Sequence, residues 1–467
     1  MIKRILVLMA AMLFAFAAKP ALSVSDAEYA ALLKKVQDLQ AQVNAMQQPE
    51  NMKSNSGYVK SKKENLMILT TGGGIKINSS NGNKFQIGGR LMFDLDSYDK
   101  GLNSTNGSSA EENEWRRSRI YISGQSGKHW SYKWVQNVDH ESIDSEGEAD
   151  NDKIHEAYIK LDLKPFWVQA GKFNLPTLLE ERTSAKWIET IERSVVEEVL
   201  YANGLVSKAS FGGIALGFAD KNIFGGIPVS GTIGIYDTEK EKKKNLGDDS
   251  TEEDSYLTGM RLSAMPSLGG KNHFMHFGIT KTSQDFEFNS FTTEQHLGIH
   301  TVASRTFTSV AEAGDVDTTG LEFAYQNGPF TFVAEDIDVD VDGADQSQDL
   351  DFDGYYLGAT YFLTGESRKW EWKGAKFDKP SGIKNEWGAW QLVGRFEEYE
   401  INNKALTDQI ELNRTVLGVN WFPTKNVRVS LNRVHLDVDG SPGGTETVLY
   451  QNQDSANGWS FRLQYAM

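Results

Sequence analysis

The sequence predicts an all-β protein: an antiparallel transmembrane β-barrel of about 16 strands, preceded by a short N-terminal coiled-coil helix. From Lys84 onward, apolar and polar residues alternate in one run after another. Short connectors such as Lys164-Pro165 alternate with long polar ones such as 141–152. The chain contains 43 glycines but only 10 prolines, which suits many strands joined by tight turns. Short turns at one end and long loops at the other are typical of outer-membrane barrels.

Residues 1–23 are predicted to be a secretory signal peptide. Lys3 and Arg4 precede an apolar run, 5–18, which is too short to span a bilayer as a helix. The formal net charge is -16, and removal of these two cations makes it -18. Such an acidic chain is a poor partner for nucleic acid. The absence of cysteine excludes a disulfide framework in an exported protein.

A short amphipathic helix is predicted at 26–48. Apolar residues there step by three and four positions, as in a coiled-coil seam of about two and a half heptads. An oligomerising coiled coil is one interpretation, and a lone amphipathic helix lying on another surface is the alternative, since helices of this length are marginal alone. Pro49 ends the pattern, and 49–83 is predicted to be a polar linker.

The barrel is predicted to occupy 84–467. In one run, Ala157, Ile159 and Leu161 share one face of a strand while the polar residues between them share the other. The predicted strands begin near Lys84 and continue through 114–124, 129–139, 153–163, 166–173, 208–219, 227–236, 255–265, 272–281, 318–326, 329–341, 352–364, 387–399, 410–421, 425–438 and 458–467.

A soluble β-sandwich or propeller is the alternative fold. A propeller would show a repeat of 40 to 50 residues, and the sequence contains none. Aromatic residues at the strand ends instead favour girdles at the two membrane interfaces. These residues are Trp130, Tyr361, Trp390, Trp421, Trp459 and Tyr465.

The long segment 174–204 is predicted to fold back into the barrel. It is too polar for a core and too rich in aromatic residues for a plain linker. Loops of this length are usually functional or disordered. We therefore expect it to bring Lys186 to the narrowest part of a pore, with pairing of Lys186 to Glu189 or Glu192 on a helical turn as the alternative.

Several short motifs, taken in order, resemble the phosphate-selective porin O and P family over residues 84–467. They are Gly89-Arg90-Leu91, Trp115-Arg116-Arg117-Ser118-Arg119, Glu156-Ala157-Tyr158, Gly171-Lys172-Phe173 with Pro176, Thr183-Ser184-Ala185-Lys186, Glu192-Arg193-Ser194, Trp387-Gly388-Ala389-Trp390-Gln391-Leu392-Val393-Gly394-Arg395, and Leu417-Gly418-Val419-Asn420-Trp421-Phe422.

The resemblance implies a trimeric outer-membrane barrel whose third long loop folds inside and whose arginines and lysines guide anions. The double arginine of the family's second strand matches Arg116-Arg117, and the lysine of its inward loop matches Lys186. The family's mid-barrel arginine ladder is not carried over, because 297–306 contains only Arg305. The chain ends in Met467, where an aromatic residue is usual for such a barrel.

Strand alternation directs several cations away from the apolar face, which in a barrel places them in the lumen. Guanidinium groups bind phosphate oxygens in a bidentate way, whereas the alternative is that they merely pair with carboxylates inside the pore. The predicted anion pathway is Lys186, Arg116, Arg117, Arg90, Arg119, Lys160 and Arg395.

No metal, cofactor or catalytic site is predicted. Asp338, Asp340, Asp342, Gly343 and Asp349 have a calcium-loop spacing, but they also continue the alternation of a strand, and a solvated strand end is the favoured interpretation. No nucleophile elbow, zinc-binding helix or phosphate-cradling loop is present, so an enzyme is not expected.

The sequence therefore predicts a porin of the bacterial outer membrane, assembled as a homotrimer in contact with lipid, that passes small anions such as phosphate. A general or weakly cation-preferring pore is the first alternative, suggested by the excess of acidic residues. A surface-binding or envelope-anchoring barrel that conducts little is the second.

Overall fold

The computed structural model describes residues 66–71, 74–103, 109–138, 154–175, 177–203, 212–237, 256–270, 272–343, 348–383, 385–404, 410–439, 449 and 453–467. The predicted signal peptide, 1–23, and the predicted coiled-coil helix, 26–48, lie outside the described residues.

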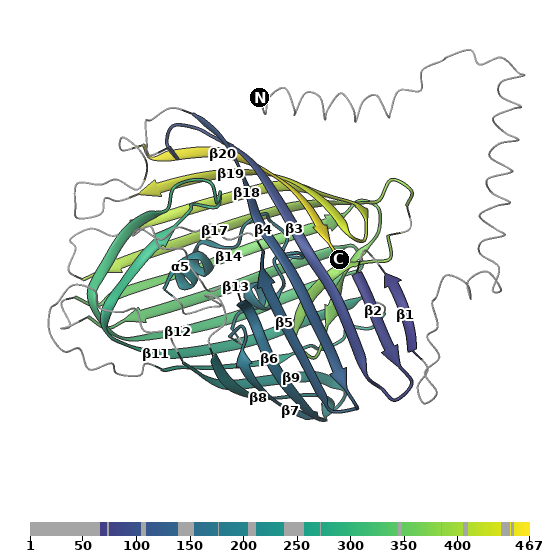
Figure 1. Ribbon diagram of the computed structural model, residues 1–467. Helices are drawn as coiled ribbons and strands as arrows, with labels where there is room; N and C mark the ends of the chain where they lie inside the picture. Colours follow the sequence, from purple (N-terminus) through teal and green to yellow (C-terminus); the bar gives the residue numbers. More distant parts are fainter. Residues whose placement is uncertain are drawn as a thin grey trace, which may run out of the picture.

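Sixteen antiparallel strands pair in chain order and close into a barrel, because the last strand, β20, pairs with the first, β3 (Figure 1). The predicted strand number is confirmed. The strands are β3 (Lys84–Tyr98), β4 (Ala110–Ser126), β5 (Trp130–Asn137), β6 (Ile154–Leu163), β7 (Phe166–Lys172), β8 (Gly212–Phe224), β9 (Ile227–Asp237), β10 (Tyr256–Ala264), β11 (His273–Gln295), β12 (Arg305–Asn327), β13 (Phe330–Val341), β14 (Leu350–Phe362), β17 (Ala389–Asn403), β18 (Ile410–Thr424), β19 (Val427–Asp439) and β20 (Ser455–Ala466).

Period-two alternation places one face of each strand outside and the other in the lumen. On β6, Ile159 is 58% exposed on the outer face. On β20, Leu463 is exposed on the outer face, whereas Arg462 and Gln464 beside it are buried inside the barrel. This arrangement, apolar outside and polar inside, is the one a lipid-embedded barrel requires.

Two further strands extend the sheet within the range predicted to be a linker, 49–83. β1 (Leu66–Thr71) pairs with β2 (Gly74–Ser79), and β2 pairs with the first residues of β3. The apolar run of β1 and the alternation of β2 account for these strands. The linker prediction is therefore wrong for residues 66–71 and 74–79.

The short connections lie at one end of the barrel. Residues 164–165, 225–226, 328–329 and 425–426 join neighbouring strands there. Gly225 and Gly226 have φ values of 63° and 95°, the left-handed conformation that a tight hairpin turn requires and that glycine adopts freely. We call this end of the barrel the turn end.

Strands β11 and β12 are longer than the sequence predicts, at 23 residues each. The prediction placed them at 272–281 and 318–326, because the alternation is irregular farther from the turn end, where the ladder contains bulges. Their connection folds into the barrel, since Leu297, Ile299 and Val302 are buried there. His300 of this connection contacts Glu114 of β4 at 2.8 Å.

A second inserted segment carries two short helices, α4 (Leu179–Arg182) and α5 (Val195–Ala202). Figure 1 shows α5 inside the barrel. Its apolar residues Val195, Val196, Val199 and Leu200 are buried in the main hydrophobic cluster with inward residues of the wall strands. We call residues 174–203 the inward loop. Within the predicted range 174–204, Pro176 and Gly204 lie outside the described residues.

A third inserted segment enters from the turn end. Between β14 and β17 the chain forms a hairpin of β15 (Ser367–Glu371) and β16 (Lys376–Ser381), a separate two-stranded sheet. It packs beneath the inward loop, where the main-chain N–H of Phe377 donates to Thr183. The lumen is thus narrowed from both ends.

Aromatic residues gather on the outer face near the turn end. Trp390 and Trp421 stack with their ring centroids 5.5 Å apart, and Tyr361 on a neighbouring strand is 46% exposed. Such a row suits a membrane interface. Among the described residues, no helix is both long enough and apolar enough to cross a bilayer.

Candidate functional site: the lumen of the barrel

A β-bulge in β4 directs two adjacent arginines into the lumen. The pairing of β3 with β4 shifts between Met92 and Asp94, so that Trp115 and Arg116 together face Phe93. Trp115 remains outside, 57% exposed and packed on Phe93, while Arg116 reaches the inward loop. Arg117 lies opposite the buried Met92. Strict alternation would direct only one of the two arginines inward.

One group of cations holds the inward loop against the wall. Arg395 of β17 forms a buried ion pair with Glu180 of α4. Arg414 of β18 pairs with Glu397 at 2.7 Å, and Glu397 in turn accepts a hydrogen bond from the N–H of Val195 at the start of α5. Each helix of the loop is therefore tied to the wall through a charged side chain.

The wall holds the middle of the loop partly through contacts to the loop's main chain. Arg428 of β19 donates hydrogen bonds to the carbonyl oxygens of Ile188 and Glu189, both at 2.8 Å. Arg462 of β20 pairs with Asp94 at 2.6 Å and also binds Glu192. These contacts hold residues 188–192 against β19 and β20.

Glu192 is the carboxylate on which two guanidinium groups converge. Arg116 binds it through two hydrogen bonds, at 3.0 and 3.1 Å, and Arg462 binds it from the other side. Burial acts to raise the pKa of Glu192, but Arg116 and Arg462 outweigh it and hold the pKa well below its usual value. Glu192 is therefore ionised throughout the ordinary pH range.

The β15–β16 hairpin contributes one more cation that holds the inward loop in place. Arg368 of β15 forms an ion pair with Glu189 and donates to the carbonyl oxygen of Trp187 at 2.9 Å. Glu189 and Glu192 were the alternative partners expected for Lys186, and both are bound by arginines instead.

Lys186 faces the other side of the loop. Its ammonium lies 5.0 Å from the ring centroid of Tyr121, and among the described residues it has no carboxylate oxygen within ion-pair distance. Burial and, to a smaller extent, the nearby cations Arg90 and Lys133 together lower the pKa of Lys186 to about 8. Lys186 is charged at neutral pH and loses its proton near pH 8.

Three arginines share this open side. Arg90 lies opposite Arg119 in the pairing of β3 with β4. Arg117 lies close enough to Arg90 and Arg119 to interact electrostatically with both. Arg119 is partly occupied, since it donates to Asn137 at 2.7 Å. With Lys186, these residues form a cluster of like charge that we call the upper cation cluster.

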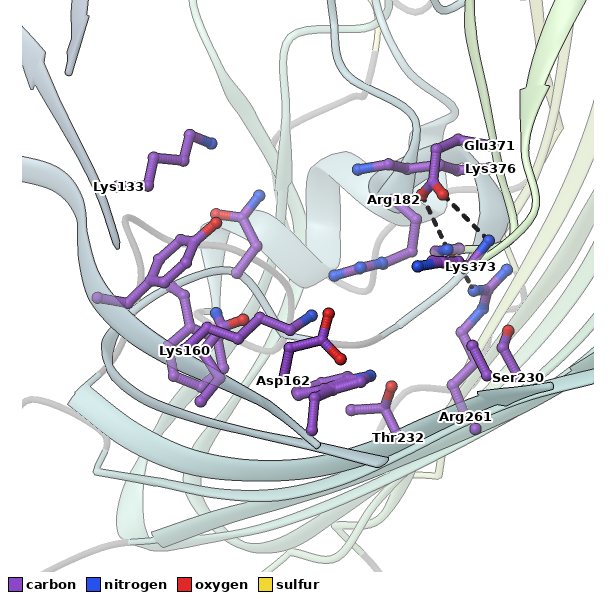
Figure 2. A pocket seen from close by; sticks show the side chains of 18 of the residues that line it. Lys133, Lys160, Asp162, Arg182, Ser230, Thr232, Arg261, Glu371, Lys373 and Lys376 are labelled. Atoms are coloured by element: carbon purple, nitrogen blue, oxygen red, sulfur yellow. Dashed lines mark hydrogen bonds between the residues drawn. The ribbon is translucent and has the colours of Figure 1, made fainter. Parts of the chain in front are cut away.

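Below the loop, toward the turn end, lies a cavity of about 400 Å³. Figure 2 shows Lys160 of β6 and Arg182 of α4 pointing into it from facing sides. Lys160 lies over the ring of Trp167, 3.9 Å from its centroid. Seven lysines and arginines line the cavity against four carboxylates, so its lining carries an excess of positive charge.

The hairpin supplies much of this lining. Lys373 and Lys376 of the hairpin lie beside Glu371 and Arg182 (Figure 2). Burial and, to a smaller extent, Arg182 together lower the pKa of Lys376 to about 8. We call the cavity and its cations the lower cation cluster.

The seven residues of the predicted pathway therefore fall into two sets. Arg116 and Arg395 bind carboxylates of the inward loop, whereas Lys186, Arg90, Arg117, Arg119 and Lys160 belong to the two cation clusters. Sequence reasoning missed Lys133, Arg182 and Lys376. The alternation that marks the other cations applies to neither Arg182, on a short helix, nor Lys376, on a hairpin outside the wall.

The acidic segment of β13 keeps its alternation. Ile337, Val339 and Val341 are buried, while Asp338 and Asp340 are exposed on the outer face. Residues 344–347 of the proposed calcium loop lie outside the described residues.

A closed 16-stranded barrel, narrowed by its own loops and lined with cations, is an outer-membrane porin. The chain belongs to the family described as phosphate-selective porin O and P, which residues 85–467 match. Porin O of Pseudomonas aeruginosa is 26% identical over 436 residues, covering 85% of this chain and 92% of that protein. The protein is thus a porin of the bacterial outer membrane that passes small anions.

Solved structures share the fold. In-vitro folded OmpT, an outer-membrane protein of Vibrio cholerae, is 12% identical with a TM-score of 0.50, covering 82% of this chain and 98% of that one. The OmpT variant lacking loop L8 has the same TM-score at 10% identity, covering 82% and 99%. At these identities the likeness shows the fold alone.

Proposed function

We propose that the protein is a homotrimeric channel, not an enzyme, that passes phosphate and similar small oxyanions along the open side of the inward loop. The observation that carries this proposal is the division of the lumen cations. Those behind the loop are paired with carboxylates or carbonyl oxygens. In the lower cation cluster Lys133 pairs with Glu156 and Arg261 with Glu322, whereas Lys160 and Arg182 there, and Lys186 of the upper cation cluster, face the passage.

The two clusters offer an anion successive partners of different chemistry. Arg90, Arg117 and Arg119 present planar guanidinium groups, which match the oxygens of phosphate. Lys186 is a compact, hydrated point charge that holds an anion without fixing its orientation. An anion can exchange from one group to the next, which conduction requires because tight binding at a single site would stop the flow.

The excess of acidic residues does not oppose this reading. Asp338 and Asp340 point away from the lumen, and Glu180, Glu192 and Glu397 are bound behind the loop. The field inside a narrow passage depends on the groups that line it, because its low-dielectric walls focus their charge. The general or cation-preferring pore is therefore the weaker alternative.

The charge-reversal variant Lys186→Glu tests the pathway. In planar bilayers with a salt gradient, the reversal potential should shift toward cations, and block of chloride current by inorganic phosphate should weaken. Lys128→Glu is the matched control, since Lys128 is exposed in the turn between β4 and β5 and makes the same change in net charge. An unchanged reversal potential and phosphate block in Lys186→Glu would reject the pathway and favour a general pore.

The trimer is tested separately. Each closed barrel has no unpaired strand edge and therefore resists detergent. The proposed trimer should accordingly migrate as a compact oligomer until heated. Crosslinking and light scattering should both give three chains per particle. A particle of one chain under mild detergent would contradict the trimer and leave the proposed pathway unaffected.

A further inference from the structure

Three glutamates converge behind the inward loop, on the side away from the passage. Glu180 belongs to α4, Glu197 to α5 and Glu335 to the wall strand β13. Each is at most 3% exposed. One carboxylate oxygen from each lies within 4.8 Å of the other two. The cluster therefore joins both helices of the loop to the wall.

The surrounding charges do not balance. When all are ionised, the five carboxylates of this region outnumber the three guanidinium groups by two negative charges. Uncompensated buried charge is strongly destabilising, because the cost of leaving water is not recovered. The carboxylates are Glu180, Glu181, Glu197, Glu335 and Glu397, and the guanidinium groups are Arg193, Arg395 and Arg414.

One oxygen of the cluster has no partner. Oε1 of Glu197 is buried and has no hydrogen-bond partner among the described residues, while its Oε2 accepts from Arg193 at 3.1 Å. The other two carboxylates are satisfied on both oxygens. Glu335 accepts from the N–H groups of Leu179 and Glu180 and from Tyr356. Glu180 accepts from Ser194 and Arg395.

We propose that Glu180, Glu197 and Glu335 bind one divalent cation of the size of calcium. Calcium takes oxygen ligands at about 2.3–2.6 Å, so two oxygens on one ion lie at most about 5 Å apart, which matches the cluster. Magnesium, with ligands at about 2.0–2.1 Å, requires the oxygens to move closer together. A doubly charged cation cancels the excess of two negative charges and gives Oε1 of Glu197 a partner.

The cation clamps α4 and α5 to β13 and so fixes the two ends of the segment that carries Lys186. Its removal frees the loop to move within the lumen, because three carboxylates then repel one another. The clamp is independent of which anion passes.

Calcium uptake by the full-length protein tests this proposal. The protein, purified in detergent and stripped with EDTA, is titrated calorimetrically with calcium chloride, and bound calcium is counted by elemental analysis. One calcium per chain should bind. Glu197→Gln should weaken binding about tenfold or more, and stripped wild-type channels should show larger current fluctuations that added calcium suppresses.

Two controls localise the site. Glu181→Gln removes a neighbouring carboxylate that also pairs with Arg193 and should keep the calcium. The double variant Asp338→Asn, Asp340→Asn removes exposed outer-face carboxylates and should keep it too. Loss of calcium in the double variant with retention in Glu197→Gln would place the ion on the outer face and overturn the proposal.

The wild-type protein alone also tests whether the calcium site exists, so the outcome does not depend on the folding of a variant. If the stripped wild type takes up no calcium at about 1 mM, a concentration at which extracellular calcium modules bind, the clamp does not exist. The carboxylates are then neutralised by protons. Equal uptake of magnesium would overturn the assignment to a calcium-sized ion.

Discussion

The guanidinium of Arg428 donates a hydrogen bond to the carbonyl oxygen of Ile188 at 2.8 Å, so a wall strand grips the main chain two residues from Lys186. Arg428→Gln shortens the side chain and loses these bonds. The loop should then move more freely, with larger fluctuations of single-channel current and weaker anion preference. Arg433→Gln is the control, since Arg433 is exposed on the outer face of the same strand. Steady currents in Arg428→Gln would show that the other contacts suffice to hold the loop.

Lys186 should make anion preference depend on pH. Its pKa is lowered to about 8 by burial and by the neighbouring cations Arg90 and Lys133, so its charge is present below this pH and is lost above it. The reversal potential in a salt gradient should therefore move toward cations between pH 7 and 9. Lys186→Arg keeps its charge in this range and should show a flatter profile. Identical profiles for the two proteins would assign any pH effect to other groups.

Glu192 should stabilise the barrel and mask two cations. Glu192→Gln leaves Arg116 and Arg462 without this partner and should lower the free energy of unfolding by about 3–5 kcal/mol. It should also strengthen anion preference, because one negative charge beside Arg116 and Arg462 is removed. Urea unfolding followed by tryptophan fluorescence measures the first effect, and reversal potentials measure the second. Glu386→Gln, at an exposed turn, should change neither.

The same ion pairs set an acid limit. The pKa of Glu192 lies well below its usual value, so its contribution to stability is present above the pKa of an unfolded glutamate, about 4.3. The contribution disappears as pH falls through the lowered folded value. Stability should therefore differ between wild type and Glu192→Gln at pH 7, and the difference should shrink in strong acid.

Closure depends on β20. A chain ending at Asn457 lacks all the residues that pair β20 with β3 and most of those that pair it with β19, so both neighbours gain open edges. It should fail to insert into vesicles and should give no heat-modifiable band on a gel. Met467→Phe, which places the usual aromatic residue at the end, should insert normally. Stable insertion of the truncated chain would mean that the barrel closes elsewhere.

The number of strands could be predicted because each wall strand keeps one apolar face, and the period of two survives even in the acidic strand that contains Val339. The halves of β11 and β12 far from the turn end could not be predicted, because beyond the lipid nothing requires an apolar outer face. The β15–β16 hairpin could not either. It lies inside a polar lumen, where residues such as Arg368 and Lys376 need no alternation.

The sequence predicts which cations face the lumen better than it predicts which partners those cations bind. Alternation identifies that Arg395 and Arg90 both face inward, but not that Arg395 meets Glu180 while Arg90 faces the passage. That distinction depends on where the inward loop comes to rest, and the loop is placed by contacts across more than 200 positions of the chain, such as the contact between Arg428 and Ile188.

The bulge beside Phe93 makes the charge of the pore sensitive to a single codon. Deleting Trp115 would restore regular pairing between β3 and β4, turn Arg116 toward the position that Trp115 now occupies, and leave Arg117 alone inside. The strand count and the turns would stay the same. A lineage of such barrels can therefore gain or lose a cation in the passage by one in-frame insertion or deletion, without replacing any residue.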